Sequence, residues 1–111
     1  FKVGSILASA EGGGANLGDE DLKKIEAYID VFAEKIPPPK GFVIPAGSPA
    51  VASLHLARAV VRRAERRIVS IARRRSIYDI IPYMNRLSSL LYVLARVVAS
   101  RRGEAEWIWR A

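Results

Sequence analysis

Apolar residues recur every three or four positions in three segments of this chain, which is the repeat of an amphipathic helix. The first segment carries Leu22, Ile25, Ile29, Phe32 and Ile36. The second carries Leu54, Ala57, Val61, Ala64 and Ile68, and the third carries Leu87, Leu90, Leu91, Leu94 and Val98. No segment alternates apolar and polar residues as a half-buried strand does. We therefore predict an all-α fold, an antiparallel helical bundle without strands.

Prolines and capping residues set the boundaries that we expect for these helices. Residues 19–21 are all acidic, and negative charge is favoured at a helix start by the helix dipole. The run of three prolines at 37–39 ends the first long helix. Ser48 followed by Pro49 is typical of an N-cap and the first helical residue. The second long helix should therefore begin at Pro49.

The last long helix has a less regular beginning. Ser76 and Asp79 have the spacing of a capping box, but Pro82 lies too far inside the helix for a comfortable first turn. We therefore expect a kink or a late start at Pro82. The chain as a whole is predicted to be one helical-bundle domain over residues 1–111. Its predicted parts are a helix tail over 1–8, a loop over 9–18, helices over about 20–36, 49–74 and 77–102, a loop over 37–48 and a tail over 103–111.

The first residues continue a helical pattern instead of beginning one. Val3, Ile6 and Leu7 are spaced like the end of a helix, and the first residue is Phe1. We therefore expect the domain to be N-terminally incomplete.

The residue types exclude several kinds of site. With no cysteine and one histidine, the chain has no disulfide scaffold, no cysteine nucleophile and too few ligands for an ordinary zinc site. We expect no protein-bound metal. The glycine run at 12–14 is not followed by the Lys-Ser or Lys-Thr pair of a P-loop. The longest uncharged stretch, residues 41–57, contains two prolines and is mostly small residues, so it is not a membrane span.

Charge divides the chain into two halves. Residues 1–40 hold all five lysines against seven acids, whereas residues 41–111 hold thirteen arginines against four acids, for a net charge of +7. A cationic half built only from arginine predicts a polyanionic partner, and the planar guanidinium fork favours phosphate oxygens. The same composition favours a cytoplasmic protein of prokaryotic type; a mitochondrial protein that has lost its transit peptide is the alternative.

Four charged residues form one row on the second long helix. Arg58, Arg62, Glu65 and Arg66 lie at i, i+4, i+7 and i+8 and adjoin the apolar stripe, while Arg63 points away from both. Such a row can be a solvated helix face, a nucleic-acid-binding helix or a phosphate site at a bundle or subunit interface. The adjacent apolar stripe and the scarcity of interleaved aromatic residues disfavour nucleic acid. The residues alone leave these alternatives open.

Several blocks of sequence are together far more specific than any short motif. They read Phe-Val-Ile-Pro-Ala-Gly-Ser at 42–48, Leu-His-Leu-Ala-Arg at 54–58, Arg-Arg-Ala-Glu-Arg-Arg at 62–67, Tyr-Met-Asn-Arg-Leu-Ser at 83–88 and Leu-Ala-Arg at 94–96. In this respect the chain resembles the PduO-type ATP:cob(I)alamin adenosyltransferases, over nearly all of its length.

The resemblance implies a homotrimer of five-helix subunits with active sites between neighbouring subunits. It also implies transfer of the 5′-deoxyadenosyl group of ATP to the cobalt of cob(I)alamin, with release of triphosphate and with Mg²⁺ accompanying ATP. Neither nucleic acid nor a membrane is expected as a partner. Cob(I)alamin is itself a strong nucleophile, so such a protein needs alignment and electrostatic stabilisation of the leaving group more than a catalytic base.

The resemblance also implies roles for particular residues. Those carried over to the ATP side are Arg58, Arg62, Glu65, Arg66, Asn85 and Arg86. Arg58, Arg62 and Glu65 are expected to be catalytic as well. Phe42 matches the aromatic residue that faces the corrin ring from below and is expected to be catalytic through the cobalt. Without the resemblance, Phe42 would be read as a plug of the core beneath its loop.

The chain departs from the family pattern in two places. The phosphate-binding Thr-Lys-x-Gly-Asp-x-Gly stretch and the Leu-Asp-Glu-Leu-Asn helix have no counterpart in it. The acid that follows Asn-Arg-Leu-Ser in the family is replaced by Ser89, which puts the usual pairing of that acid with an arginine in doubt. Two alternative functions therefore stay open: a corrinoid-binding scaffold without transfer, and a basic helical module that binds nucleic acid.

Overall fold

The computed structural model describes residues 1–8 and 17–109, so most of the predicted loop over 9–18 lies outside the described residues. Helices account for nearly all of the regular structure, as predicted. In chain order the elements are α1 (Lys2–Ala8), α2 (Asp19–Ala33), β1 (Phe42–Val43), α3 (Pro49–Ile71), α4 (Arg75–Tyr78), α5 (Ile80–Arg101) and β2 (Ile108–Trp109).

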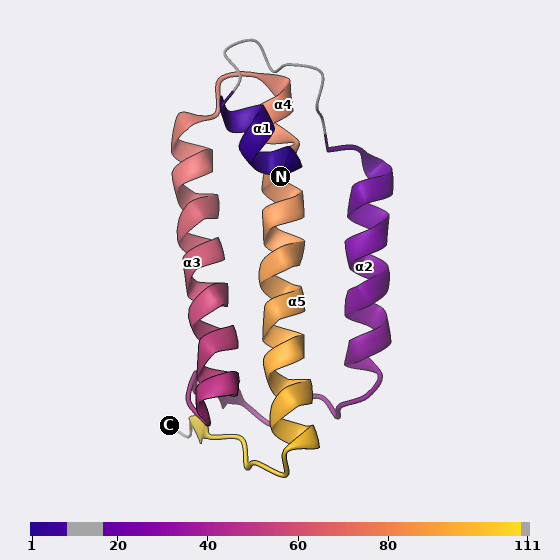
Figure 1. The fold of residues 1–111 in the computed structure, drawn as a ribbon, viewed down its shortest axis with the longest axis vertical. Helices are drawn as coiled ribbons and strands as arrows, with labels where there is room; N and C mark the ends of the chain where they lie inside the picture. Colours follow the sequence, from indigo (N-terminus) through magenta and orange to yellow (C-terminus); the bar gives the residue numbers. More distant parts are fainter. Residues whose placement is uncertain (9–16, 110–111) are drawn as a thin grey trace.

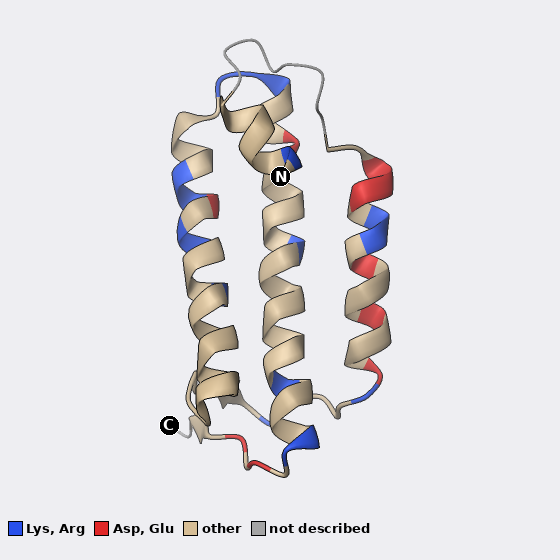
Figure 2. Cartoon of the chain, viewed as in Figure 1, with Lys and Arg blue, Asp and Glu red and all other residues tan. Residues whose placement is uncertain are grey.

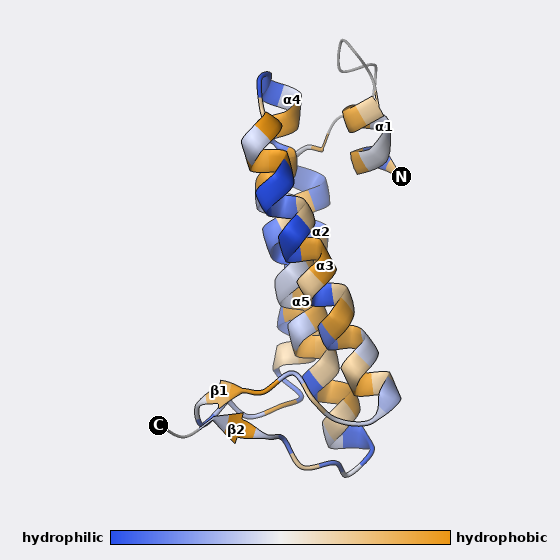
Figure 3. Ribbon diagram, turned by 90° about the vertical axis from the view of Figure 1, so that its left-hand side faces the viewer, coloured by the Kyte–Doolittle hydropathy of each residue, from blue (hydrophilic) through white to orange (hydrophobic). Residues whose placement is uncertain are grey.

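The three long helices lie in one layer, with α5 between α3 and α2 (Figure 1). Helix α3 runs antiparallel to α5, whereas α2 runs parallel to it. A view turned by 90° superimposes the three helices in one column (Figure 3). Because one layer cannot enclose α5 on all sides, the predicted stripe from Leu87 to Val98 is only half-buried. The apolar residues of α5 that are buried are Ile80, Met84, Ala95, Val97 and Ala99.

Two clusters of buried residues hold the layer together. The larger one lies near the α3–α4 connection and consists of Ile6, Leu17, Ile68, Ala72, Ile77, Ile80 and Met84. The smaller one lies at the opposite end of α3 and α5 and consists of Val51, Ala95 and Ala99. Ile6 and Ile80 are completely buried, so α1 is anchored by its single buried side chain. Each Ile or Leu side chain buried in this way contributes about 1.5–3 kcal/mol relative to exposure.

The predicted start of α3 is confirmed and the predicted capping box is wrong. Ser48 Oγ accepts a hydrogen bond from the Val51 amide at 3.5 Å, and Pro49 is the first helical residue. Asp79 caps no helix with its side chain, because its carboxylate lies 3.7 Å from Arg75 Nε. Helix α4 is a separate short turn, so α5 starts late and Pro82 falls in its first turn, where its missing N–H breaks no intrahelical bond.

The other helix ends also differ from those predicted. Helix α2 ends at Ala33, before the three prolines, and α3 ends at Ile71 instead of residue 74. At the C-terminus of α5, Gly103 adopts a positive φ of 69°, its amide donates to Ser100 O, and the Glu104 amide donates to Ala99 O. This pair of bonds is a Schellman motif, which turns the chain back along α3 and α5.

The prediction of a bundle without strands is wrong in one place, because the chain contains a short antiparallel sheet. Strand β1 pairs with β2 in the register Phe42 with Trp109 and Val43 with Ile108. Strands of two residues are too short for alternation to be visible. A Cβ atom at Gly41 would lie 2.9 Å from Ile108 Cγ2, so a glycine is needed for the close approach of the two segments.

Candidate anion-binding cleft between α3 and α5

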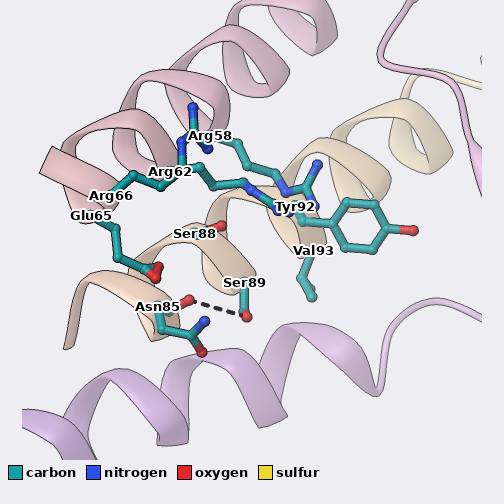
Figure 4. A pocket seen from close by; sticks show the side chains of 9 residues that line it. All are labelled: Arg58, Arg62, Glu65, Arg66, Asn85, Ser88, Ser89, Tyr92 and Val93. Atoms are coloured by element: carbon teal, nitrogen blue, oxygen red, sulfur yellow. Dashed lines mark hydrogen bonds between the residues drawn. The ribbon is translucent and has the colours of Figure 1, made fainter. Parts of the chain in front are cut away.

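A cleft of about 310 Å³ opens between α3 and α5. Helix α3 contributes Arg58, Arg62, Glu65 and Arg66, and α5 contributes Asn85, Ser88, Ser89, Tyr92 and Val93 (Figure 4). Five of the six residues expected on the ATP side are therefore brought together in one place. We call this the arginine cleft.

Helical periodicity explains why these side chains meet. The α3 residues lie at i, i+4, i+7 and i+8, and the α5 residues lie at i, i+3, i+4, i+7 and i+8, so each set occupies one face of its helix. Because α3 and α5 pack side by side and antiparallel, the two faces line one cleft. Figure 4 shows Glu65 and Asn85 at the same end of it.

Arg58 is held in a fixed orientation by an aromatic ring. Its guanidinium carbon lies 5.0 Å from the centroid of the Tyr92 ring, in a cation–π contact. Its Nε atom is buried and has no hydrogen-bond partner among the described residues. A buried donor without a partner is rare in native proteins. The ring contact therefore holds this guanidinium in one orientation at the wall of the cleft.

The charge of the cleft selects an anionic ligand. Three arginines face one carboxylate, that of Glu65, within a single cleft. Half of the acidic residues in the described ranges lie on α2, while basic residues mark α3 and the α3–α4 connection (Figure 2). Ser89 Oγ donates to Asn85 O at 3.3 Å, so this serine is tied to its own helix. Hydroxyl and amide groups from α5 face the arginines and add neutral hydrogen-bonding groups.

Arg86 does not line the arginine cleft. It turns toward α2, where its Nε atom lies 3.0 Å from Glu26 Oε1, and it donates from a terminal nitrogen to Asn85 Oδ1 at 3.0 Å. With Glu26, Ile29, Asp30 and Ser89 it lines a second cleft between α2 and α5. Residue 86 lies about 100° around the helix from residue 85, on the side that faces α2, so its side chain reaches Glu26 instead of the cleft.

Phe42 lies in β1, at the end of the layer where the strands are (Figure 3). Its side chain is 69% exposed, so the reading of Phe42 as a plug of the core is wrong. Trp107 and Trp109 are also exposed, and Trp109 is the register partner of Phe42. The structure therefore gathers an exposed aromatic surface at this end.

Sequence reasoning missed several members of the site region. Tyr92, Ser88 and Val93 share the helix face of Asn85, and the spacing of seven between Asn85 and Tyr92 was the available signal. His55 is buried, and its Nδ1 atom has no partner among the described residues. No group of three or more potential metal-ligating His, Cys, Asp or Glu residues occurs in the described ranges.

Burial lowers the pKa of His55 below its ordinary value of 6.5, and the nearby Arg58 charge lowers it further, while Glu106 opposes both. At pH values below 6.5, His55 is therefore protonated to a greater extent in the unfolded chain than in the folded chain. We expect the free energy of unfolding to fall as the pH is lowered from about 7.5 to about 5.5. Urea unfolding of the intact protein measures this. His55→Gln should flatten the profile in that window, and parallel profiles for the two proteins would contradict the prediction.

A cleft lined by three arginines in a mostly helical domain has the charge and the donors that suit an anionic group such as a phosphate. The family model for cobalamin adenosyltransferase matches residues 1–98 of the chain. The chain belongs to this family.

Two curated relatives bear related names. Corrinoid adenosyltransferase from Bacillus subtilis is 39% identical over 88 residues, which cover 78% of this chain and 46% of that protein. Corrinoid adenosyltransferase MMAB from Homo sapiens is 37% identical over 89 residues, which cover 79% of this chain and 36% of that protein. The chain thus spans less than half the length of these relatives.

Solved structures show the same fold. A variant of the PduO-type ATP:corrinoid adenosyltransferase from Lactobacillus reuteri, complexed with cobalamin and ATP, superimposes with a TM-score of 0.86 at 28% identity. The match covers 100% of this chain and 64% of that one. A second variant of that enzyme, complexed with ATP, gives a TM-score of 0.87 at 29% identity. No helix in the described part of the chain is long and apolar enough to cross a membrane.

Proposed function

We propose that this chain is part of an ATP:cob(I)alamin adenosyltransferase. In the reaction, the cobalt of cob(I)alamin attacks the 5′ carbon of ATP, the cobalt–carbon bond forms, and the carbon–oxygen bond breaks with its electron pair passing to triphosphate. The arginine cleft is the observation that carries this proposal, because it supplies fixed positive charge where a triphosphate leaving group would develop its negative charge. Family membership supports the same activity.

The residues of the cleft have distinct proposed roles. Arg58 and Arg62 bind phosphate oxygens and stabilise the leaving group, and Arg66 and Asn85 orient the nucleotide. Glu65 is the one carboxylate among the described residues that line the cleft. Mg²⁺ is commonly held by one or two carboxylates together with substrate phosphates. One carboxylate and neighbouring hydroxyls therefore fit an ion that arrives with ATP, and bound Mg²⁺ would neutralise part of the phosphate charge.

Arg86 has a supporting part in this proposal. Its bonds to Glu26 and Asn85 connect α2 to the edge of the arginine cleft, so it orients Asn85 from behind. Phe42 is proposed to lie against the lower face of the corrin, where an apolar ring would exclude water and any axial ligand from the cobalt. Its exposure supports this role, because an exposed ring is available to a ligand.

We further propose that the intact protein is a homotrimer with its active sites between subunits, located in the cytoplasm. The half-buried stripe of α5 and the exposed Leu56 and Val60 of α3 support association, since soluble proteins rarely leave extensive apolar surface uncovered. Light scattering of the intact protein at micromolar concentration should give the mass of a trimer. A monomer under these conditions would contradict the prediction.

Ser89 favours one alternative, a scaffold that binds corrinoid without transferring the adenosyl group. Its hydroxyl is bonded to Asn85 O, and Arg86 is paired with Glu26 instead. Position 89 therefore offers no carboxylate to pair with an arginine, and a loss of catalytic alignment would be the consequence.

The absorbance spectrum of the corrinoid tests the proposal directly. The intact protein is mixed with ATP, Mg²⁺ and chemically reduced cob(I)alamin, and formation of the cobalt–carbon bond is followed with time. We expect ATP-dependent turnover, with triphosphate released in equal amount. Corrinoid binding that ATP does not affect would select the scaffold instead. Binding of duplex DNA that falls steeply with salt, without turnover, would select the nucleic-acid module.

A further inference from the structure

Arg96 is a buried charged residue outside the arginine cleft. Only 5% of its surface is exposed, and on α5 it follows directly after Ala95 of the smaller core cluster. A buried guanidinium is strongly destabilising unless it is paired and hydrogen-bonded. Its partner is Glu106, ten residues later, with Arg96 Nε at 2.6 Å from Oε1 and the second nitrogen at 3.2 Å from Oε2. This bidentate ion pair holds the segment that follows α5 against the helix.

The tail is fastened at a second point by Glu104. Its Oε1 atom accepts a hydrogen bond from the Ser48 amide at 2.9 Å, at the N-terminus of α3, and its Oε2 atom accepts from Arg102 at 2.7 Å. The hydrogen bond from the Ser48 amide is the main cause that lowers the pKa of Glu104, so the carboxylate is ionised at neutral pH. The segment from Glu104 to Trp107, here called the strap, is therefore held to both α3 and α5.

The strap continues directly into the strand that holds Phe42. The Ile44 amide donates to Trp107 O at 2.7 Å, and β2 then pairs with β1 through Val43 and Phe42. The absence of a side chain at Gly41 lets the two segments approach closely. Because the Phe42 ring is mostly exposed, contacts with the core do not fix it. Its position depends on the backbone of β1, and β1 depends on the strap.

We propose that Arg96 and Glu106 are positioning residues for Phe42. They act through the strap and β2, and they touch neither ATP nor the reacting atoms. This inference rests on the proposed function only in giving Phe42 its place beside the corrin. The claim that the Arg96–Glu106 pair keeps β1 ordered does not depend on the proposed function.

The experiment compares the intact protein with Glu106→Gln, which removes one charge and keeps the shape of the side chain. Hydrogen exchange at the Ile44 amide, measured by NMR, should accelerate at least tenfold, because its acceptor is the residue after Glu106. Exchange within the middle of α3 should stay unchanged. The KM for cob(I)alamin should rise several-fold, or the fraction of bound Co(II) that lacks a lower ligand should fall, while the KM for ATP stays within twofold. Glu34→Gln, an exposed glutamate at the end of α2, is the matched control.

Rescue distinguishes positioning from general stability. Val43 and Ile108 are directly opposed in the sheet, and the chain has no other cysteine, so Val43→Cys with Ile108→Cys can form one disulfide there. Added to Glu106→Gln, this disulfide should restore the slow exchange and the corrinoid parameters. If Glu106→Gln does not fold, Arg96→Gln with Glu106→Gln leaves no unpaired buried charge and takes its place.

The outcomes separate this inference from the proposed function. Faster hydrogen exchange at the Ile44 amide, with an unchanged KM for cob(I)alamin and unchanged bound Co(II), would overturn the positioning role of the pair. It would not contradict the proposed transferase activity. Unchanged Ile44 exchange would overturn the strap itself. If the wild-type protein neither binds nor adenosylates cob(I)alamin, the proposed function fails, and the exchange measurement still decides whether the pair orders β1.

Discussion

Replacing Arg62 by alanine is expected to weaken ATP binding by about ten- to a hundredfold. The reason is the loss of one charge-assisted hydrogen bond to a phosphate oxygen, which is typically worth about 1.5–3 kcal/mol. Arg62 lines the arginine cleft, and none of the ion pairs within the described residues includes it. The melting temperature should therefore change little. Titration calorimetry with ATP and a thermal melt measure the two effects in the same samples.

The chain provides a matched control one residue away. Arg63→Ala removes the same charge from the same helix, and Arg63 is exposed and does not line the arginine cleft. A general loss of electrostatic attraction would weaken both variants equally, whereas a direct contact would affect Arg62→Ala alone. Equal losses of ATP affinity in the two variants would indicate general electrostatic attraction. A large loss of stability in Arg62→Ala without a change in ATP affinity would give the row a structural role. Either result would contradict the prediction.

Phe42→Ala is expected to slow adenosylation at least tenfold at saturating ATP, on the order of 1.4 kcal/mol or more in the barrier. If Phe42 lies against the corrin as proposed, its removal lets water or another ligand reach the lower face of the cobalt, and Co(II) becomes harder to reduce to the nucleophilic Co(I). The KM for ATP should stay nearly unchanged, because Phe42 lies in β1, at the strand end of the layer, and does not line the arginine cleft. Stopped-flow absorbance gives the rate, and the spectrum of bound Co(II) reports the added ligand.

An exposed aromatic residue elsewhere supplies the comparison for Phe42. Tyr28 on α2 is 54% exposed, so Tyr28→Ala removes a ring of similar size without disturbing β1. We expect it to leave the rate and the Co(II) spectrum unchanged. A Phe42→Ala protein with normal turnover would remove the ring from the mechanism and leave only its strand pairing with Trp109.

The main features of the site were predictable because each rests on one helix. The periodicity of α3 alone places Arg58, Arg62, Glu65 and Arg66 on one face, and it did so correctly. The stacking of Arg58 on Tyr92 was not predictable, because it depends on the relative register of α3 and α5, which neither helix pattern contains. The direction of Arg86 was not predictable either, because it depends on an ion pair with Glu26 on α2 that the local motif does not contain.

The features that sequence reasoning missed are those that need contacts between distant segments. Ser76 and Asp79 have the right spacing for a capping box. In the structure, however, Ser76 Oγ accepts a hydrogen bond from Arg74, and the Asp79 carboxylate pairs with Arg75. The pairing of β1 with β2 depends on the turn at Gly103, which brings the tail back along the helices. Local propensity carries little information about such pairings.

The pairing of β1 with β2 has a consequence for the order of folding. The two strands flank the α3–α5 hairpin in the chain, so their contact closes a long loop and carries the entropy cost of that closure. That cost becomes small only when α3 and α5 have already docked and brought the loop ends together. The strands should therefore be the last part of this unit to form and the first to open under native conditions. Local opening of the β1–β2 pairing would give a large, rigid macrocycle access to the exposed aromatic residues while α3 and α5 remain packed.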